Sequence, residues 1–115
     1  MMNLVVKRSK WLRGEEDSYL VRGSDKKMCC LGFLGRQCNI TQKEMLDIGL
    51  PNRVDHDHKF PSAIIETDKY GDSICSMLCD EIVHTNDTSI ISDKQRERKL
   101  TQLFKKADIA ITFVD

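Results

Sequence analysis

The stretch at residues 28–35, which reads MCCLGFLG, decides the fold because it holds no charged side chain on any side. A helix that is apolar all round belongs in the interior of a protein. Gly32 and Gly35 each cost about 1 kcal/mol relative to alanine inside a helix, and close approach of another backbone is their natural compensation. We therefore predict a central buried helix over residues 28–38.

Two further helices are predicted from their start signals. The capping-box pattern at Thr41 predicts a helix over 42–48 that ends at Gly49, and the same pattern at Ser92 predicts a helix over 93–107. The buried stripe of the longer helix consists of Leu100, Leu103, Phe104 and Ala107.

A fourth helix is expected to begin at Asp72 or Ser73 and to end near His84. Its apolar side chains recur three and four residues apart, as they do on one face of a helix. They are Ile74, Cys75, Leu78, Cys79, Ile82 and Val83.

The C-terminal residues 109–114 alternate in the manner of a strand, and residues 63–65 and 18–21 also have strand composition. A lone strand leaves backbone groups unpaired, so the C-terminal strand needs a partner within the chain or in a second copy, which would make a homodimer. A chain of 115 residues is one domain's worth. We expect a single compact α+β domain over residues 1–115, with about three helices packed on a small sheet that includes the C-terminal strand.

The composition limits the class of protein. Basic and acidic residues both number 18, and this zero net charge argues against a protein that coats duplex DNA. Charged residues make up 31% and apolar residues 40% of the chain, so it is neither disordered nor membrane-spanning, and we expect no membrane partner. Five cysteines without a secretion signal predict reduced thiols in a cytoplasm. Residues 51–91 hold three basic and eight acidic side chains, whereas both flanking segments are mildly basic.

Alternating carboxylates and imidazoles at residues 54–58, VDHDH, form the sharpest chemical motif. Asp55, His56 and His58 are candidate metal ligands, because both imidazoles would project to the same side of an extended segment. The string resembles the core of HNH nucleases of the phage endonuclease VII type, which implies a divalent cation beside the scissile phosphate. Those enzymes also carry two Cys-x-x-Cys zinc pairs, which this sequence lacks. The alternative is a solvated polar loop.

Four cysteines form two pairs that are candidates for chemistry. Cys75 and Cys79 would lie one helical turn apart, where they could face a metal ion together or serve as small core hydrophobes. Cys29 and Cys30 follow two lysines, whose charge could activate a thiol as a nucleophile. Core packing is the interpretation that we favour for both pairs.

A basic cluster near the N-terminus consists of Lys7, Arg8 and Lys10 beside Trp11. It predicts nucleic-acid binding, with the cations on phosphates and the indole stacked on a base. The alternative is a solvated segment with Trp11 docked in the core.

Residues 27–34, KMCCLGFL, resemble the Lys-x-Cys-Cys-Leu-Gly signature of small uncharacterised phage and prophage proteins. Other segments also match those proteins and follow one another in the same order: residues 11–14, 50–51 and 86–87 and the terminal Phe-Val-Asp. One position differs, since Asp108 stands where members often carry glycine. The resemblance implies an origin in a phage or mobile element, and it supplies no catalytic residues.

We therefore expect a phage-type accessory protein that works without a cofactor in the host cytoplasm. It would act non-enzymatically by binding a host or phage macromolecule, and inhibition of a host defence or transcription system is one such role. A metal-dependent HNH-like nuclease and a small nucleic-acid-binding module are the two alternatives.

Overall fold

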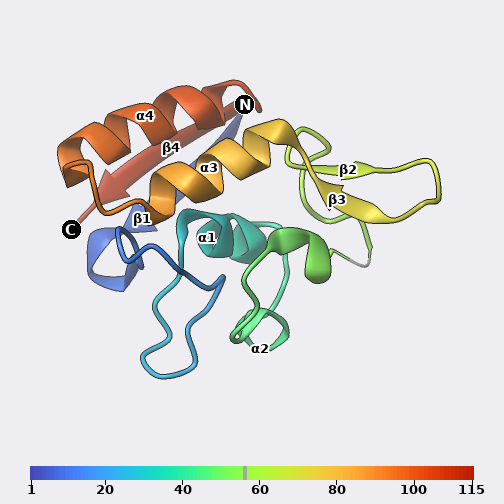
Figure 1. Cartoon of the computed structure of the whole chain (residues 1–115), viewed down its shortest axis with the longest axis horizontal. Helices are drawn as coiled ribbons and strands as arrows, with labels where there is room; N and C mark the ends of the chain where they lie inside the picture. The colour runs from blue at the N-terminus through green and yellow to red at the C-terminus, as the bar shows by residue number, and fades with distance from the viewer. Residues whose placement is uncertain (56) are drawn as a thin grey trace.

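The computed structural model describes residues 1–55 and 57–115, and it arranges them in the predicted α+β class (Figure 1). The helices are α1 (Cys30–Gln37), α2 (Gln42–Met45), α3 (Met77–Asp87) and α4 (Asp93–Lys105). The strands are β1 (Met2–Lys7), β2 (Ile65–Thr67), β3 (Ser73–Cys75) and β4 (Ile109–Val114), and the short 3-10 turns are η1 (Arg8–Lys10) and η2 (Pro51–Arg53). Within the described ranges, no helix is long and apolar enough to cross a membrane.

The predicted C-terminal strand is confirmed as β4, and its partner lies within the chain. β4 pairs in parallel with β1, in a register that runs from Met2 opposite Ile109 to Lys7 opposite Val114. Side chains of both strands alternate between the core and solvent, and helix α4 packs against β4 (Figure 1). The first and last strands of the described chain therefore share one small sheet.

The central buried helix is confirmed as α1, which begins two residues later than predicted. Gly32 lies so close to the preceding segment that an added Cβ would come within 1.9 Å of the Leu20 carbonyl oxygen. Gly35 similarly faces the Met45 sulfur, 2.6 Å from where its Cβ would be. The predicted close approach of another backbone is thus confirmed at Gly32, whereas Gly35 is approached by side chains.

Asn86, near the end of α3, ties three distant segments together in the interior. Its Oδ1 accepts hydrogen bonds from Trp11 Nε1 at 2.9 Å and from the Cys30 backbone amide at 3.1 Å. Its Nδ2 donates to the Leu12 carbonyl oxygen at 3.0 Å. The buried Arg96 guanidinium donates to three carbonyl oxygens of residues 85–88 and so satisfies the end of the same helix.

The helix predicted from Asp72 or Ser73 is wrong at its start. Residues Ser73–Cys75 form β3 instead, and β3 pairs antiparallel with β2. The helix cap is Ser76, whose Oγ accepts from the Cys79 amide at 3.0 Å. The apolar spacing that predicted the helix continues through the strand, so it does not reveal where one element ends and the other begins.

Other boundaries also differ from prediction. Residues 18–21 do not form a named strand, since Val21 makes only an isolated bridge to Leu46. Helix α2 ends at Met45 because the backbone leaves the helical region at Leu46, where ψ is 122°, and Asp47 then adopts a left-handed φ of 55°. The capping box at Ser92 is confirmed, and the helix that it starts ends shortly before Asp108, which has φ 59°.

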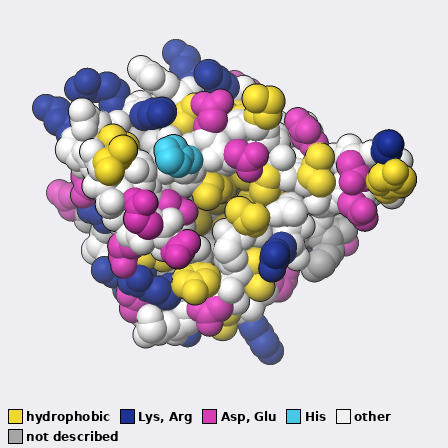
Figure 2. All heavy atoms as spheres, in the orientation of Figure 1, with side chains coloured by type: hydrophobic (Ala, Val, Ile, Leu, Met, Phe, Trp, Pro, Cys, Tyr) yellow, Lys and Arg dark blue, Asp and Glu magenta, His cyan; other side chains and the backbone are white. Residues whose placement is uncertain are grey.

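Strands β2 and β3 and the turn at residues 68–72 form a hairpin that we call the arm. The arm projects from one end of the molecule, beyond the helices (Figure 1). Figure 2 shows hydrophobic and charged side chains together at the protruding end.

Candidate functional site

The arm presents an aromatic side chain on an ordered turn. The Asp68 carboxylate accepts from the backbone amides of Tyr70 at 2.8 Å and Asp72 at 2.9 Å, and the Asp68 amide donates to the Asp72 carbonyl oxygen at 2.9 Å. Gly71 supplies the left-handed φ of 84° that the turn requires. Tyr70 is held at the tip with 77% of its surface exposed. Asp68, Gly71 and Asp72 are residue types that favour turns, but the sequence does not show that this turn projects from the molecule.

Apolar and acidic side chains are exposed along the arm and at its base. Ile74 on β3 is exposed, and Met77, the first residue of α3, is 83% exposed where the arm joins the helix. The arm itself contains three carboxylates, Glu66, Asp68 and Asp72, and one lysine, Lys69, whose ammonium lies 5.2 Å from the Tyr70 ring centroid. The arm is therefore an acidic surface with exposed apolar side chains.

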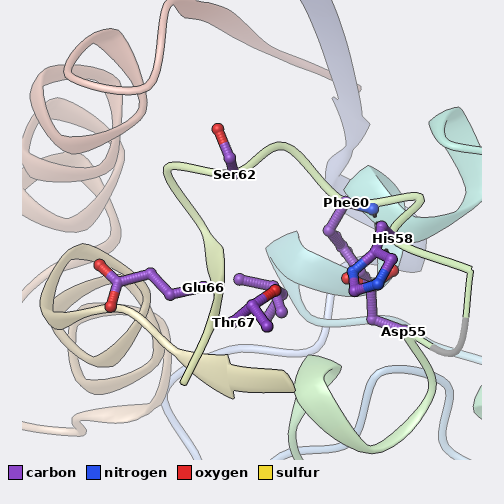
Figure 3. A pocket seen from close by; sticks show the side chains of 7 residues that line it. Asp55, His58, Phe60, Ser62, Glu66 and Thr67 are labelled. Atoms are coloured by element: carbon purple, nitrogen blue, oxygen red, sulfur yellow. Dashed lines mark hydrogen bonds between the residues drawn. The ribbon is translucent and has the colours of Figure 1, made fainter. Parts of the chain in front are cut away.

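A pocket of about 400 Å³ lies between the base of the arm and the loop that carries the VDHDH motif (Figure 3). It is lined by Asp55, His58, Phe60, Ser62, Ile65, Glu66 and Thr67. In Figure 3, Asp55 and His58 lie on the same side, whereas the Glu66 carboxylate points away from them. The structure thus brings two of the three predicted metal ligands to one pocket, while His56 lies outside the described residues.

The Asp55 side chain holds its own loop in shape. It is 2% exposed, and its Oδ1 accepts from the backbone amides of Lys59 at 2.6 Å and Phe60 at 3.1 Å. Among residues 1–55 and 57–115, no three His, Cys, Asp or Glu side chains are grouped so that they could hold a metal ion. The nuclease alternative therefore stays a prediction, which magnesium-dependent DNA cleavage and metal analysis of the purified protein would test.

The basic cluster is divided between surface and interior. Trp11 is 2% exposed, and its ring packs 4.8 Å from the Phe113 ring centroid, so it offers no free face to a base. Arg8 forms ion pairs with Glu97 at 2.8 Å and Asp115 at 2.9 Å. Lys7 and Lys10 are exposed. A nucleic-acid surface here would consist of these lysines without the stacking residue that the prediction included.

The cysteine pairs occupy different surroundings. Cys29 and Cys30 are buried at the start of α1, and burial raises the pKa of the Cys29 thiol to about 12 and that of the Cys30 thiol well above its usual value. This favours core packing over a nucleophile. Cys79 is also in the core, whereas Cys75 is half-buried at the end of β3.

Comparison of the chain with protein-family models, with curated proteins and with solved structures finds no match. Function must therefore be inferred from the geometry of the arm, the pocket and the cysteine pairs.

Proposed function

We propose that this protein acts non-enzymatically by docking on a partner protein through the arm. The observation that carries the proposal is Tyr70, an exposed aromatic side chain on a turn that three hydrogen bonds of Asp68 keep ordered. Exposed aromatic residues on rigid supports are typical centres of protein interfaces, because little conformational freedom is lost when they bind.

The charge of the arm indicates the chemistry of the partner. Its carboxylates would repel nucleic-acid phosphates and attract lysine and arginine side chains, which favours a protein over a nucleic acid. We therefore infer a basic surface with an apolar recess that accepts the Tyr70 ring.

The resemblance of residues 27–34 to small phage proteins supports a phage or mobile-element origin, and therefore a contact made inside the host cell. In that setting the protein is a phage or mobile-element accessory protein in the host cytoplasm, and its partner is a host or phage protein. The acidic arm could inhibit a host defence or transcription protein by covering the basic surface with which that protein binds nucleic acid.

The test is affinity capture from phage-infected bacterial lysate with three immobilised baits, followed by binding measurements on the purified partner. The baits are the unmodified protein, Tyr70→Ala, and Ile90→Ala as the matched control, since Ile90 is 86% exposed but lies in the loop between α3 and α4. We expect the partner to bind the first and third baits, and Tyr70→Ala to weaken its affinity at least about tenfold.

The same partner should bind more weakly at higher salt and to Glu66→Lys, because charge attraction contributes to the contact. Partners that Tyr70→Ala retains as well as the unmodified protein would contradict the proposal. An acidic partner would also contradict the proposal. The same holds if no captured protein binds the unmodified bait more tightly than the Tyr70→Ala bait.

A further inference from the structure

Strand β4 has an outer edge that no other strand of the described chain covers. Its sheet contains only β1 and β4, so each strand has one paired edge and one outer edge. The Met2 amide of β1 donates to the Asp108 carbonyl oxygen at 3.1 Å. Since successive residues direct their backbone groups to alternate edges, every second residue of β4 faces β1 and the others face outward. The outward-facing residues are Ile109, Ile111 and Phe113.

The outer edge lacks the features that usually protect an edge strand. Residues 109–114, IAITFV, include no charged residue and no proline. Natural proteins often place such residues on edge strands, because an open row of N–H and C=O groups pairs readily with another extended segment. Among residues 1–55 and 57–115, no backbone group outside the sheet bonds to the three outward-facing residues. The edge can therefore accept a third strand.

A groove of about 180 Å³ lies where β4 meets helix α4. Helix α4 packs against β4, whereas α1 packs against β1, so α4 lies on the side of the outer β4 edge. Residues 109–111 form an apolar wall of the groove, Thr101 and Lys105 form the α4 wall, and Met1 also lines it. A strand that paired with the outer edge would direct every second side chain toward α4.

The α4 wall of the groove is basic. Arg98 lies on the same side of the helix as Thr101 and Lys105, since positions three, four and seven apart share one face. Arg98 and Lys105 are both exposed, and the ion pairs of the described residues use other cations. Figure 2 shows Lys and Arg side chains gathered over α4. This charge favours an occupant that carries carboxylates.

The same charge disfavours a second copy of this chain as the occupant. Two β4 edges that paired around a twofold axis would place both α4 helices on the same face of the joined sheet. Arg98 and Lys105 of the two copies would then lie near one another, and like charges repel. An acidic segment of a different protein meets no such repulsion.

We propose that the outer edge of β4 and the basic wall of α4 bind an extended acidic peptide segment of a partner protein, which adds a third strand to the sheet. Backbone hydrogen bonds to the outward-facing residues hold the segment, and its carboxylates meet Arg98 and Lys105. This inference goes beyond the proposed docking function, because it uses no residue of the arm.

Amide hydrogen exchange of the full chain, measured by NMR, tests the edge first. In the free protein we expect slow exchange at Ala110, Thr112 and Val114, which face β1, and faster exchange at Ile111 and Phe113. Adding the capped peptide EVEVEVE should slow exchange at Ile111 and Phe113. Protection of these two amides in the free protein would overturn the proposal. If that protection increases with protein concentration, the edge binds a second copy instead.

Backbone methylation shows whether the probe binds as a strand. Two forms of EVEVEVE carry N-methyl groups on alternate amides, one form on the glutamates and the other on the valines. An added strand uses only every second amide at the shared edge, so one form should lose binding and the other should keep it. Equal affinities of the two forms would overturn the proposal.

Charge reversal tests the basic wall. Arg98→Glu combined with Lys105→Glu should weaken the binding of EVEVEVE at least about tenfold. Lys43→Glu is the matched control, since Lys43 is exposed on α2 and does not line the groove, and it should bind like the unmodified chain. Unchanged binding by the double variant, or equal binding of the basic peptide KVKVKVK, would overturn the proposal. Tyr70→Ala should bind EVEVEVE normally, so this test can fail without affecting the docking function of the arm.

Discussion

Two cysteine pairs stand at the starts of two helices, and they differ in almost every property that controls thiol chemistry. At α1, burial raises the pKa of Cys29 to about 12 and holds Cys30 in the core. At α3, the thiol of Cys79 lowers the pKa of Cys75 to about 7, and Cys75 is partly open to solvent. The start of a helix favours a thiolate in both places. The two pairs therefore differ in burial and in the pKa of the more exposed thiol, and we expect these differences to decide their reactivity.

The largest expected contrast is in alkylation rate. The pKa of Cys75 is lowered and Cys75 is partly accessible, whereas burial raises the pKa of Cys29, so a much larger share of Cys75 is the reactive thiolate at pH 7. We expect iodoacetamide to label Cys75 at least about a thousand times faster than Cys29 or Cys30 in the folded protein. Mass spectrometry of the tryptic peptides 70–94 and 28–36 measures both rates. Similar rates without denaturant would remove the contrast, and in urea the rates should converge.

The next contrast concerns the packing that buries the α1 pair. Gly32→Ala should lower the free energy of unfolding by about 3 kcal/mol, because its Cβ would meet the Leu20 carbonyl oxygen. Gly49→Ala is the matched control, since the nearest atom to its Cβ would be 3.9 Å away, and it should change stability by less than about 0.5 kcal/mol. Urea unfolding measures both. Equal stabilities would mean that α1 does not pack against residue 20 as described.

Serine substitution compares the pairs directly. Cys30→Ser places a hydroxyl in a fully buried site and should cost about 2 kcal/mol. Cys75→Ser keeps the side chain at a partly solvated site beside Asn52 and should cost about 0.5 kcal/mol or less. Chemical denaturation under reducing conditions measures the free energy of unfolding of both variants. A larger loss of stability for Cys75→Ser than for Cys30→Ser would contradict this prediction.

The smallest effect is on the pH dependence of stability. Because the pKa of Cys29 is raised in the folded protein, its thiol ionises first in the unfolded chain, so stability falls as the pH rises above the unfolded pKa. Between pH 8 and 9 this thiol should account for a loss of about 0.5 kcal/mol. Cys29→Ala should be less stable at every pH but should show a shallower decline in urea-unfolding experiments. An unchanged slope would indicate that Cys29 ionises normally.

Local signals in the sequence locate α1, α2 and α4 well. The N-cap at Thr41 and the capping box at Ser92 act within a few residues, so their effect does not depend on the rest of the fold. The short strand Ser73–Cys75 depends instead on pairing with Ile65–Thr67, and its apolar residues merge with those of the following helix. For that reason the helix is predicted three or four residues too early.

The candidate site is only partly visible in the sequence. The motif around Asp55 and His58 predicts that these residues lie close together, but not that Asp55 serves as a loop clamp. The burial of Trp11 follows from its bond to Asn86, a residue 75 positions away, which no local pattern reveals. The spacing of Cys75 and Cys79 marks the pair, yet the inequality between them arises from the change from strand to helix at Ser76.

The parallel pairing of β1 with β4 has a consequence for biosynthesis. Residues 2–7 are made well before residues 109–114, the strand that pairs with them. Until then, Leu4 and Val6 have no sheet partner, and contacts between such distant segments form slowly. In a nascent chain, β1 therefore exposes an unpaired apolar edge until Ile109–Val114 has been made, and a ribosome that stalls before Ile109 leaves that edge uncovered.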